Sequence, residues 1–181
     1  MTLADALALL RRHETRAEAG HEAAMLEEFF PFIAAHPDCL WRTCLDGHLT
    51  ASAWIVDPAR TCTLLTHHRK LDRWLQLGGH ADGEADLLTA ALREAREESG
   101  LASVGAVGAE IFDVDLHRIP ARKTEPEHWH FDVRFLFEAD PAEPFAVSDE
   151  SHALAWVPLA ELSRYSTEES LARMARKTQC G

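Results

Sequence analysis

The segment GGHADGEADLLTAALREAREESGL, from Gly78 to Leu101, decides the fold of this chain. Its glycine-rich first part suits a loop that needs unusual backbone angles. Apolar residues at helical spacing then predict a helix from about Leu87 to Ser99. Gly100 stands where a glycine commonly ends a helix, so the segment predicts a loop that leads directly into one helix.

The predicted helix carries three glutamates on one side. Glu94, Glu97 and Glu98 are spaced i, i+3, i+4 and border the apolar stripe that contains Ala91 and Ala95. Two carboxylates about 4 Å apart repel by roughly 4 kcal/mol near a protein surface, so a counter-charge is expected. Mg²⁺ or Mn²⁺ would supply it and could also bind phosphate oxygens. The plain alternative is an exposed charge run on a surface helix.

These residues give the segment a family resemblance. It resembles the Nudix box of the MutT/Nudix hydrolases, which reads glycine, five residues, glutamate, seven residues, then Arg-Glu-aliphatic-x-Glu-Glu-x-Gly-aliphatic. The positions in register are Arg93, Glu94, Glu97, Glu98, Gly100 and Leu101. The resemblance implies that the three glutamates hold Mg²⁺ or Mn²⁺, that Glu94, Glu97 and Arg93 serve catalysis, and that the fold is an α/β/α sandwich with a mixed sheet.

The first half of the box departs from the family pattern. Gly79 meets the glycine position, but Ala85 falls where the first glutamate should be, with Glu84 one place early. We expect Glu84 to act as a further metal ligand after a one-residue shift in the loop. Ala95 replaces a bulkier aliphatic residue, which changes packing and not the metal site.

The rest of the chain predicts an α/β domain behind a helical extension. Residues 1–45 are expected to be helical, with Pro37 as the end, and residues 46–181 to form the Nudix domain with a C-terminal helix at 166–178. The runs LTASAWIV and TCTLLTH, joined by DPAR, predict a hairpin. Three further strands are expected at 107–117, 128–139 and 152–157.

Residues outside the box supply candidates for the base and for substrate binding. Glu150 occupies a place similar to the late loop glutamate that family members use as metal ligand or base, and Asp149 is its rival. The residues expected to contact substrate phosphates are Arg69, Lys70, Arg73, Gly78 and Gly79. A later basic set consists of Arg118, Arg122, Lys123 and Arg134. Plain exposed turns remain the alternative for both basic sets.

Histidines suggest one alternative site. Among 11 histidines, His128 and His130 lie on one side of a predicted strand, where His80 or His117 could complete a zinc site. We do not favour it on sequence grounds, because no cysteine stands nearby and strand histidines are commonly exposed or hydrogen-bonded without metal.

Composition limits the partners. With 30 acidic and 18 basic residues the net charge is -12, which disfavours a nucleic-acid polymer or an anionic membrane. No long apolar run or signal sequence occurs, so a cytoplasmic protein is expected. The four cysteines form no C-x-x-C pair and are expected to be free thiols.

The sequence therefore predicts metal-dependent hydrolysis of a diphosphate linkage in a small nucleoside-diphosphate-like substrate. A homodimer is compatible with the resemblance. Two alternatives stay open: an enzyme similar to isopentenyl-diphosphate isomerase, which would need an active-site cysteine and glutamate, and a nucleotide-binding regulator without catalysis. The helix itself does not distinguish nucleoside triphosphates, dinucleotides, ADP-sugars and coenzyme derivatives.

Overall fold

The computed structural model describes residues 2–17, 20–121 and 125–180, apart from the side chain of Cys180. The helices are α1 (Leu3–Glu14), α2 (His21–Ala35), α3 (Leu87–Ser99), the 3₁₀ helix η1 (Leu159–Arg164) and α4 (Glu169–Cys180). The strands are β1 (Gly47–Val56), β2 (Cys62–His68), β3 (Arg73–Leu75), β4 (Leu77–His80), β5 (Gly105–Ala106), β6 (Asp113–Ile119), β7 (His128–Glu138) and β8 (Ser151–Pro158).

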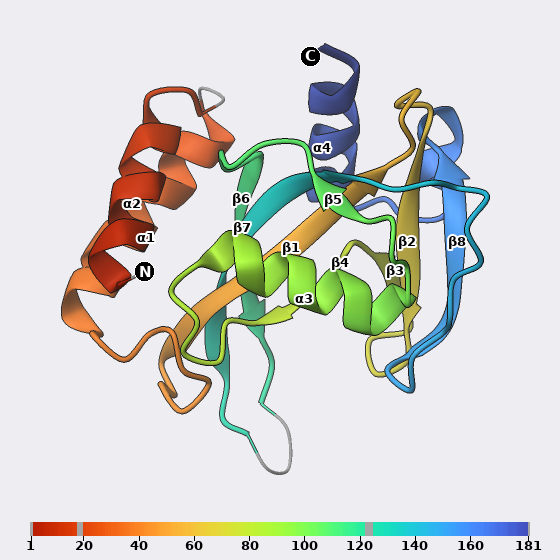
Figure 1. Cartoon of the computed structure of the whole chain (residues 1–181). Coiled ribbons are helices and arrows are strands. Elements are labelled where there is room, and N and C mark those ends of the chain that lie inside the picture. The colour runs from red at the N-terminus through yellow and green to blue at the C-terminus, as the bar shows by residue number, and fades with distance from the viewer. Residues whose placement is uncertain (1, 18–19, 122–124, 181) are drawn as a thin grey trace. The chain divides into compact units, whose positions relative to one another are not determined.

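These strands join in one sheet. Hydrogen bonds link them in the order β3-β2-β1-β7-β5, with β4 on β1, β6 on β7 and β8 on β2 (Figure 1). The sheet with its flanking helices confirms the predicted α/β/α sandwich. The described residues divide into two compact units, one made of 1–51, 79–91 and 110–135, the other of 52–78, 92–109 and 136–181.

The first unit contains the N-terminal helices. Helices α1 and α2 pack side by side, and α2 also contacts β6 (Figure 1). Two phenylalanines of α2, Phe29 and Phe32, place their rings 5.1 and 4.0 Å from that of Phe131 on β7. Inside this helical pair, His13 Nε2 lies 2.9 Å from Glu22 Oε1, and both side chains are buried. The prediction of helices in this region is confirmed.

The second unit is built around β2. This strand pairs antiparallel with β3 on one side and β8 on the other (Figure 1). Helix α4 buries Leu171 and Met174, because its apolar residues recur at helical spacing. The indole of Trp54 is fully buried, and its Nε1 donates a hydrogen bond to Thr178 Oγ1 at 2.8 Å. The predicted hairpin and C-terminal helix are confirmed.

Two local expectations were wrong. The strand expected at 107–117 exists only in its second part, as β6, because residues 107–110 are exposed and have no apolar face to bury. The glycine-rich segment was expected to be loop, but Leu77–His80 forms β4. Gly78 permits this pairing with β1: a Cβ there would lie 2.3 Å from Ser52 Oγ, and its φ of +155° disfavours other residues.

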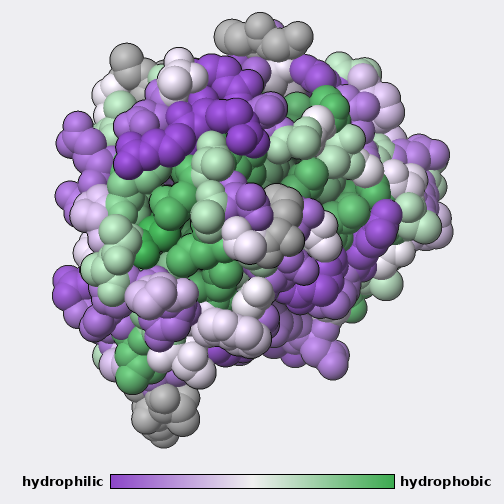
Figure 2. Space-filling model, turned by 60° about the vertical axis from the view of Figure 1, so that its left-hand side comes forward, coloured by the Kyte–Doolittle hydropathy of each residue, from purple (hydrophilic) through white to green (hydrophobic). Residues whose placement is uncertain are grey.

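The surface of the protein carries both hydrophilic and hydrophobic residues (Figure 2). On the face shown in Figure 2, hydrophobic residues lie between groups of hydrophilic ones. Among the helices of the described residues, none combines the length and the apolarity needed to cross a membrane. Cys39, Cys44 and Cys62 are free thiols as predicted, while the side chain of Cys180 lies outside the described part.

Candidate active site

Helix α3 forms where its caps and its apolar stripe predict it. Asp86 Oδ1 accepts a hydrogen bond from Thr89 N at 3.2 Å, which satisfies a free amide of the first turn. At the other end Gly100 has a φ of +70° and donates its N–H to Arg96 O at 2.8 Å. The residues on the stripe, Leu87, Ala91 and Ala95, are buried. The glutamates are therefore held at the edge of a packed helix.

The three helix glutamates differ in exposure. Glu98 is buried, the side chain of Glu94 is 15% exposed, and that of Glu97 is 61% exposed. Arg93 Nη1 lies 2.7 Å from Glu94 Oε1 and 3.6 Å from Glu97 Oε2. One guanidinium thus connects two of the carboxylates, which agrees with a positioning role for Arg93.

Glu98 is the centre of the acidic cluster. Burial is the largest cause that raises its pKa to about 8, and the charges of Glu94, Glu150 and Glu97 raise it further, while the Gly78 N–H opposes them by donating a hydrogen bond. The Oε2 atom of Glu98 is buried and has no hydrogen-bond partner among the described residues. A buried carboxylate oxygen without a donor, next to three more carboxylates, fits a divalent cation.

The charge of Glu150, in the loop before β8, also raises the pKa of Glu98. The Arg69 N–H donates to Glu150 O at 2.8 Å, and Arg69 Nη2 donates to Ser151 O at 3.0 Å. Ser151 Oγ in turn lies 2.6 Å from Thr66 Oγ1 on β2. The end of β2 therefore fixes the backbone that carries Glu150, a connection between distant segments that sequence spacing does not reveal.

The other predicted substrate contacts lie near β3 and β4. Lys70 is exposed, whereas Arg73 Nη1 is 2.9 Å from Glu168 Oε1. Gly78 provides the N–H that Glu98 accepts, and Gly79 follows it within β4. Their contacts with substrate remain predictions. The role of Gly78 as a donor to Glu98 was missed, because the sequence analysis assigned this glycine to a loop that contacts substrate and gave no sign of its approach to the helix.

The position of the first glutamate in the box pattern is where this chain departs from it, with Glu84 one place early and Ala85 in register. Glu84 Oε1 accepts a hydrogen bond from Asp86 N at 2.7 Å, just before α3 begins, and Ala85 is buried. The carboxylate of Glu84 therefore orders the loop. Its role as a metal ligand stays a prediction.

The members of the later basic set, Arg118, Arg122, Lys123 and Arg134, have different surroundings. Arg118 pairs with Glu127 and lies 5.9 Å from the Trp129 ring centroid. Arg122 and Lys123 lie outside the described residues. Arg134 is buried and forms ion pairs with Asp113 and Asp132. It therefore stabilises the fold and does not bind substrate.

The raised pKa of Glu98 gives a stability prediction for metal-free protein. Folded Glu98 keeps its proton up to about pH 8, whereas the unfolded carboxyl releases it near its ordinary value of 4.5. The free energy of unfolding should therefore fall as pH rises between those values. Glu98→Gln removes this loss, so the variant should match wild type near pH 4 and exceed it at pH 8 by up to about 5 kcal/mol.

Urea unfolding of wild type and Glu98→Gln across this pH range, with chelator present, measures the effect. Mg²⁺ at pH 8 should stabilise wild type more than Glu98→Gln, since binding to the folded state alone adds stability. Parallel pH curves for the two proteins would contradict the assignment of a buried, repelled carboxyl.

A family model described as NUDIX domain matches residues 46–178. No curated protein sequence matches the chain.

Among solved structures, the chain is similar to an Ap4A hydrolase of C. elegans in a binary complex, with 18% identity, a TM-score of 0.58, and 73% of this chain and 95% of that chain covered. It is similar to a NUDIX family hydrolase from Clostridium perfringens, with 25% identity, a TM-score of 0.56, and 74% and 97% covered. The dihydroneopterin triphosphate pyrophosphohydrolase of E. coli gives 13% identity, a TM-score of 0.54, and 71% and 92% covered.

Proposed function

Since the chain belongs to the NUDIX domain family and is a hydrolase of phosphoric anhydride bonds, we propose that it cleaves a diphosphate linkage in a small nucleoside-diphosphate-like substrate with bound Mg²⁺ or Mn²⁺. The observation that carries this proposal is the buried Glu98 carboxylate. Its Oε2 has no hydrogen-bond partner among the described residues, and the charges of Glu94, Glu97 and Glu150 raise the pKa of the carboxyl group. Without metal the repulsion is relieved by a proton on Glu98, whereas a divalent cation would offset all these charges at once.

Each residue of the cluster has a proposed task. Glu94, Glu97 and Glu98 hold the ion, and Arg93 keeps the first two carboxylates in place. When bound, a divalent ion polarises phosphoryl oxygens and lowers the pKa of water. Glu150 accepts the proton of the attacking water, since its loop is anchored beside the cluster and its carboxylate is exposed.

Substrate phosphates are proposed to contact Arg69, Lys70 and Arg73 together with the backbone at Gly78 and Gly79. The solved relatives with printed activities act on Ap4A and on dihydroneopterin triphosphate, and both names describe polyphosphate compounds. We carry over only the shared diphosphate chemistry. A net charge of -12 supports a small ligand over a nucleic-acid polymer, and we retain a cytoplasmic location, a homodimer and a domain boundary near residue 45 as proposals.

A panel of diphosphate compounds tests the proposal. Nucleoside triphosphates, dinucleoside polyphosphates and ADP-sugars are incubated with Mg²⁺ or Mn²⁺, and released phosphate or nucleoside monophosphate is measured. We expect turnover of at least one class, its loss on chelation and its return on adding metal. Tight binding without turnover of any compound would instead support the regulator.

The isomerase alternative is less well supported. It needs a cysteine at the active site, but burial raises the pKa of Cys39 to about 11 and is also the main cause that raises the pKa of Cys44 and Cys62. Isomerised prenyl diphosphate without phosphate release would favour it nevertheless, and the same assay panel detects that product.

A further inference from the structure

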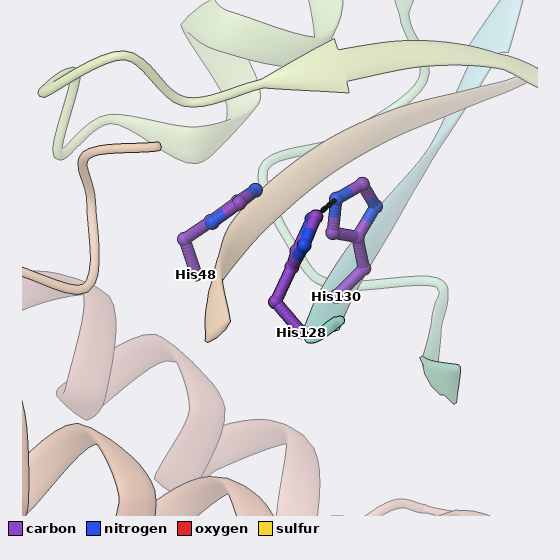
Figure 3. A group of neighbouring side chains, drawn as sticks. All are labelled: His48, His128 and His130. Atoms are coloured by element: carbon purple, nitrogen blue, oxygen red, sulfur yellow. Dashed lines mark hydrogen bonds between the residues drawn. The ribbon is translucent and has the colours of Figure 1, made fainter. Parts of the chain in front are cut away.

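We propose that His48, His128 and His130 form a second metal centre, which binds a divalent transition ion of the zinc type through three imidazole nitrogens. One ligand atom of each lies within 4.8 Å of those of the other two (Figure 3). All three residues belong to the first compact unit. This site is therefore independent of the proposed hydrolase chemistry of the glutamates.

The strands explain why these side chains meet. His128 and His130 are separated by one residue at the start of β7, so they project from the same face of the strand. His48 comes from the start of the neighbouring strand β1. Figure 3 shows the three rings turned toward one another. His117, directly opposite His130 on β6, and His80 place their ring centroids 5.4 Å from that of His130.

Backbone carbonyls fix the tautomers of two ligands. Because a carbonyl oxygen only accepts, His128 Nδ1 donates to Pro126 O at 2.9 Å, and His48 Nδ1 points at Cys44 O at 3.4 Å. Each Nε2 is then left with its lone pair. Metal-bound histidines usually make this second hydrogen bond through the other ring nitrogen, which orients the ring.

The three ring nitrogens lie close together. His48 is buried, and its Nε2 has no hydrogen-bond partner within the described part of the chain. His128 Nε2 accepts a hydrogen bond from His130 Nε2–H at 3.2 Å, so a bound ion would require the His130 proton to move to the other ring nitrogen. Two nitrogens that bind a tetrahedral zinc ion at about 2.0–2.1 Å are separated by about 3.3 Å, so this pair already has the required spacing. The ligand atom of His48 lies within 4.8 Å of the other two, so it would have to move closer to reach the same spacing of about 3.3 Å.

Burial favours the neutral, metal-binding form of His48 and His130. Burial is the largest cause that lowers the pKa of His48, of His130 and of His80, the last to about 4. Neutral imidazoles offer nitrogen ligands, which suit zinc better than magnesium. Three protein nitrogens leave the fourth position of a tetrahedral ion to water.

Zinc binding to the intact protein tests the proposal. Protein freed of metal by chelation is titrated with Zn²⁺ against a chromophoric chelator, in wild type and in a Glu94→Gln/Glu97→Gln background that weakens the glutamate site. We expect one strongly bound zinc ion per chain in both proteins. Affinity should fall at least about 100-fold in His48→Gln and in His130→Gln, since removal of outer partners alone costs 10–100-fold.

The matched control is His152→Gln, which removes an exposed imidazole on β8 and should leave zinc affinity unchanged. Unaltered affinity in His48→Gln and His130→Gln, or no strong zinc site in wild type, overturns the proposal. If a variant folds poorly, the zinc titration of wild type still tests the proposal, because it does not depend on any substitution. X-ray absorption of the zinc-loaded protein should show nitrogen neighbours at about 2.0–2.1 Å, and an oxygen-only shell would also overturn it.

Discussion

Glu97→Gln is expected to lower turnover of the best diphosphate substrate by at least about 100-fold, because a metal contact contributes several kcal/mol to the transition state and about 1.4 kcal/mol corresponds to tenfold. The fold should stay intact. The Glu97 side chain is 61% exposed and its contact in the protein is with Arg93 at 3.6 Å, so an amide of the same size costs little stability. Steady-state kinetics beside thermal unfolding measures both quantities.

Glu161→Gln is the matched control for this loss. Glu161 is a glutamate of η1 whose side chain is 46% exposed and pairs with Arg164 at 2.9 Å, so its replacement changes the same charge at another place. It should keep full turnover. High Mn²⁺ should restore part of the activity of Glu97→Gln if the glutamate acts by holding metal. Equal turnover in Glu97→Gln and wild type would refute the assigned site.

Glu98→Gln separates stability from catalysis within the same cluster. The variant is expected to be more stable than metal-free wild type at pH 8 and still to lose turnover, because the carboxylate that is costly to bury is a proposed metal ligand. A site that gains stability when a buried charge is removed is typical of function and not of packing.

Helix α3 and its glutamates could be predicted because their signals are local. Periodicity, a capping glycine and the i, i+3, i+4 spacing all act within one helix, and the helix has the predicted bounds Leu87–Ser99. Strand β4 could not be predicted in this way, because it depends on the close packing of Gly78 against Ser52, which lies 26 positions earlier in the chain. Local pattern cannot report such a close approach.

The histidine site shows the same limit. The period of a strand places His128 and His130 on one face, and that expectation agrees with their neighbouring rings. His48 was missed as the third member, since it joins them only through the proximity of β1 and β7 in the sheet. A pairing between strands about 80 residues apart depends on the tertiary fold, which sequence patterns of this kind do not specify.

Arg134→Met is expected to cost about 3–5 kcal/mol of unfolding free energy, the largest stability effect that a single substitution outside the glutamate cluster should give. Its guanidinium lies 2.7 Å from Asp132, 2.8 Å from Asp115 and 3.2 Å from Asp113, and its side chain is 2% exposed. Methionine fills similar space but leaves buried carboxylates without a cation. Urea unfolding followed by circular dichroism measures the loss.

Two companion variants decide whether charge or packing causes that loss. Arg118→Met removes an exposed arginine, 59% accessible and paired with Glu127, and should cost less than about 1 kcal/mol. Adding Asp113→Asn and Asp132→Asn to Arg134→Met removes the two most deeply buried of the three negative charges, and stability should then recover in large part because neutral amides tolerate burial better than carboxylates. If the triple variant is no more stable than Arg134→Met alone, the arginine stabilises the fold by filling space and not by neutralising aspartates.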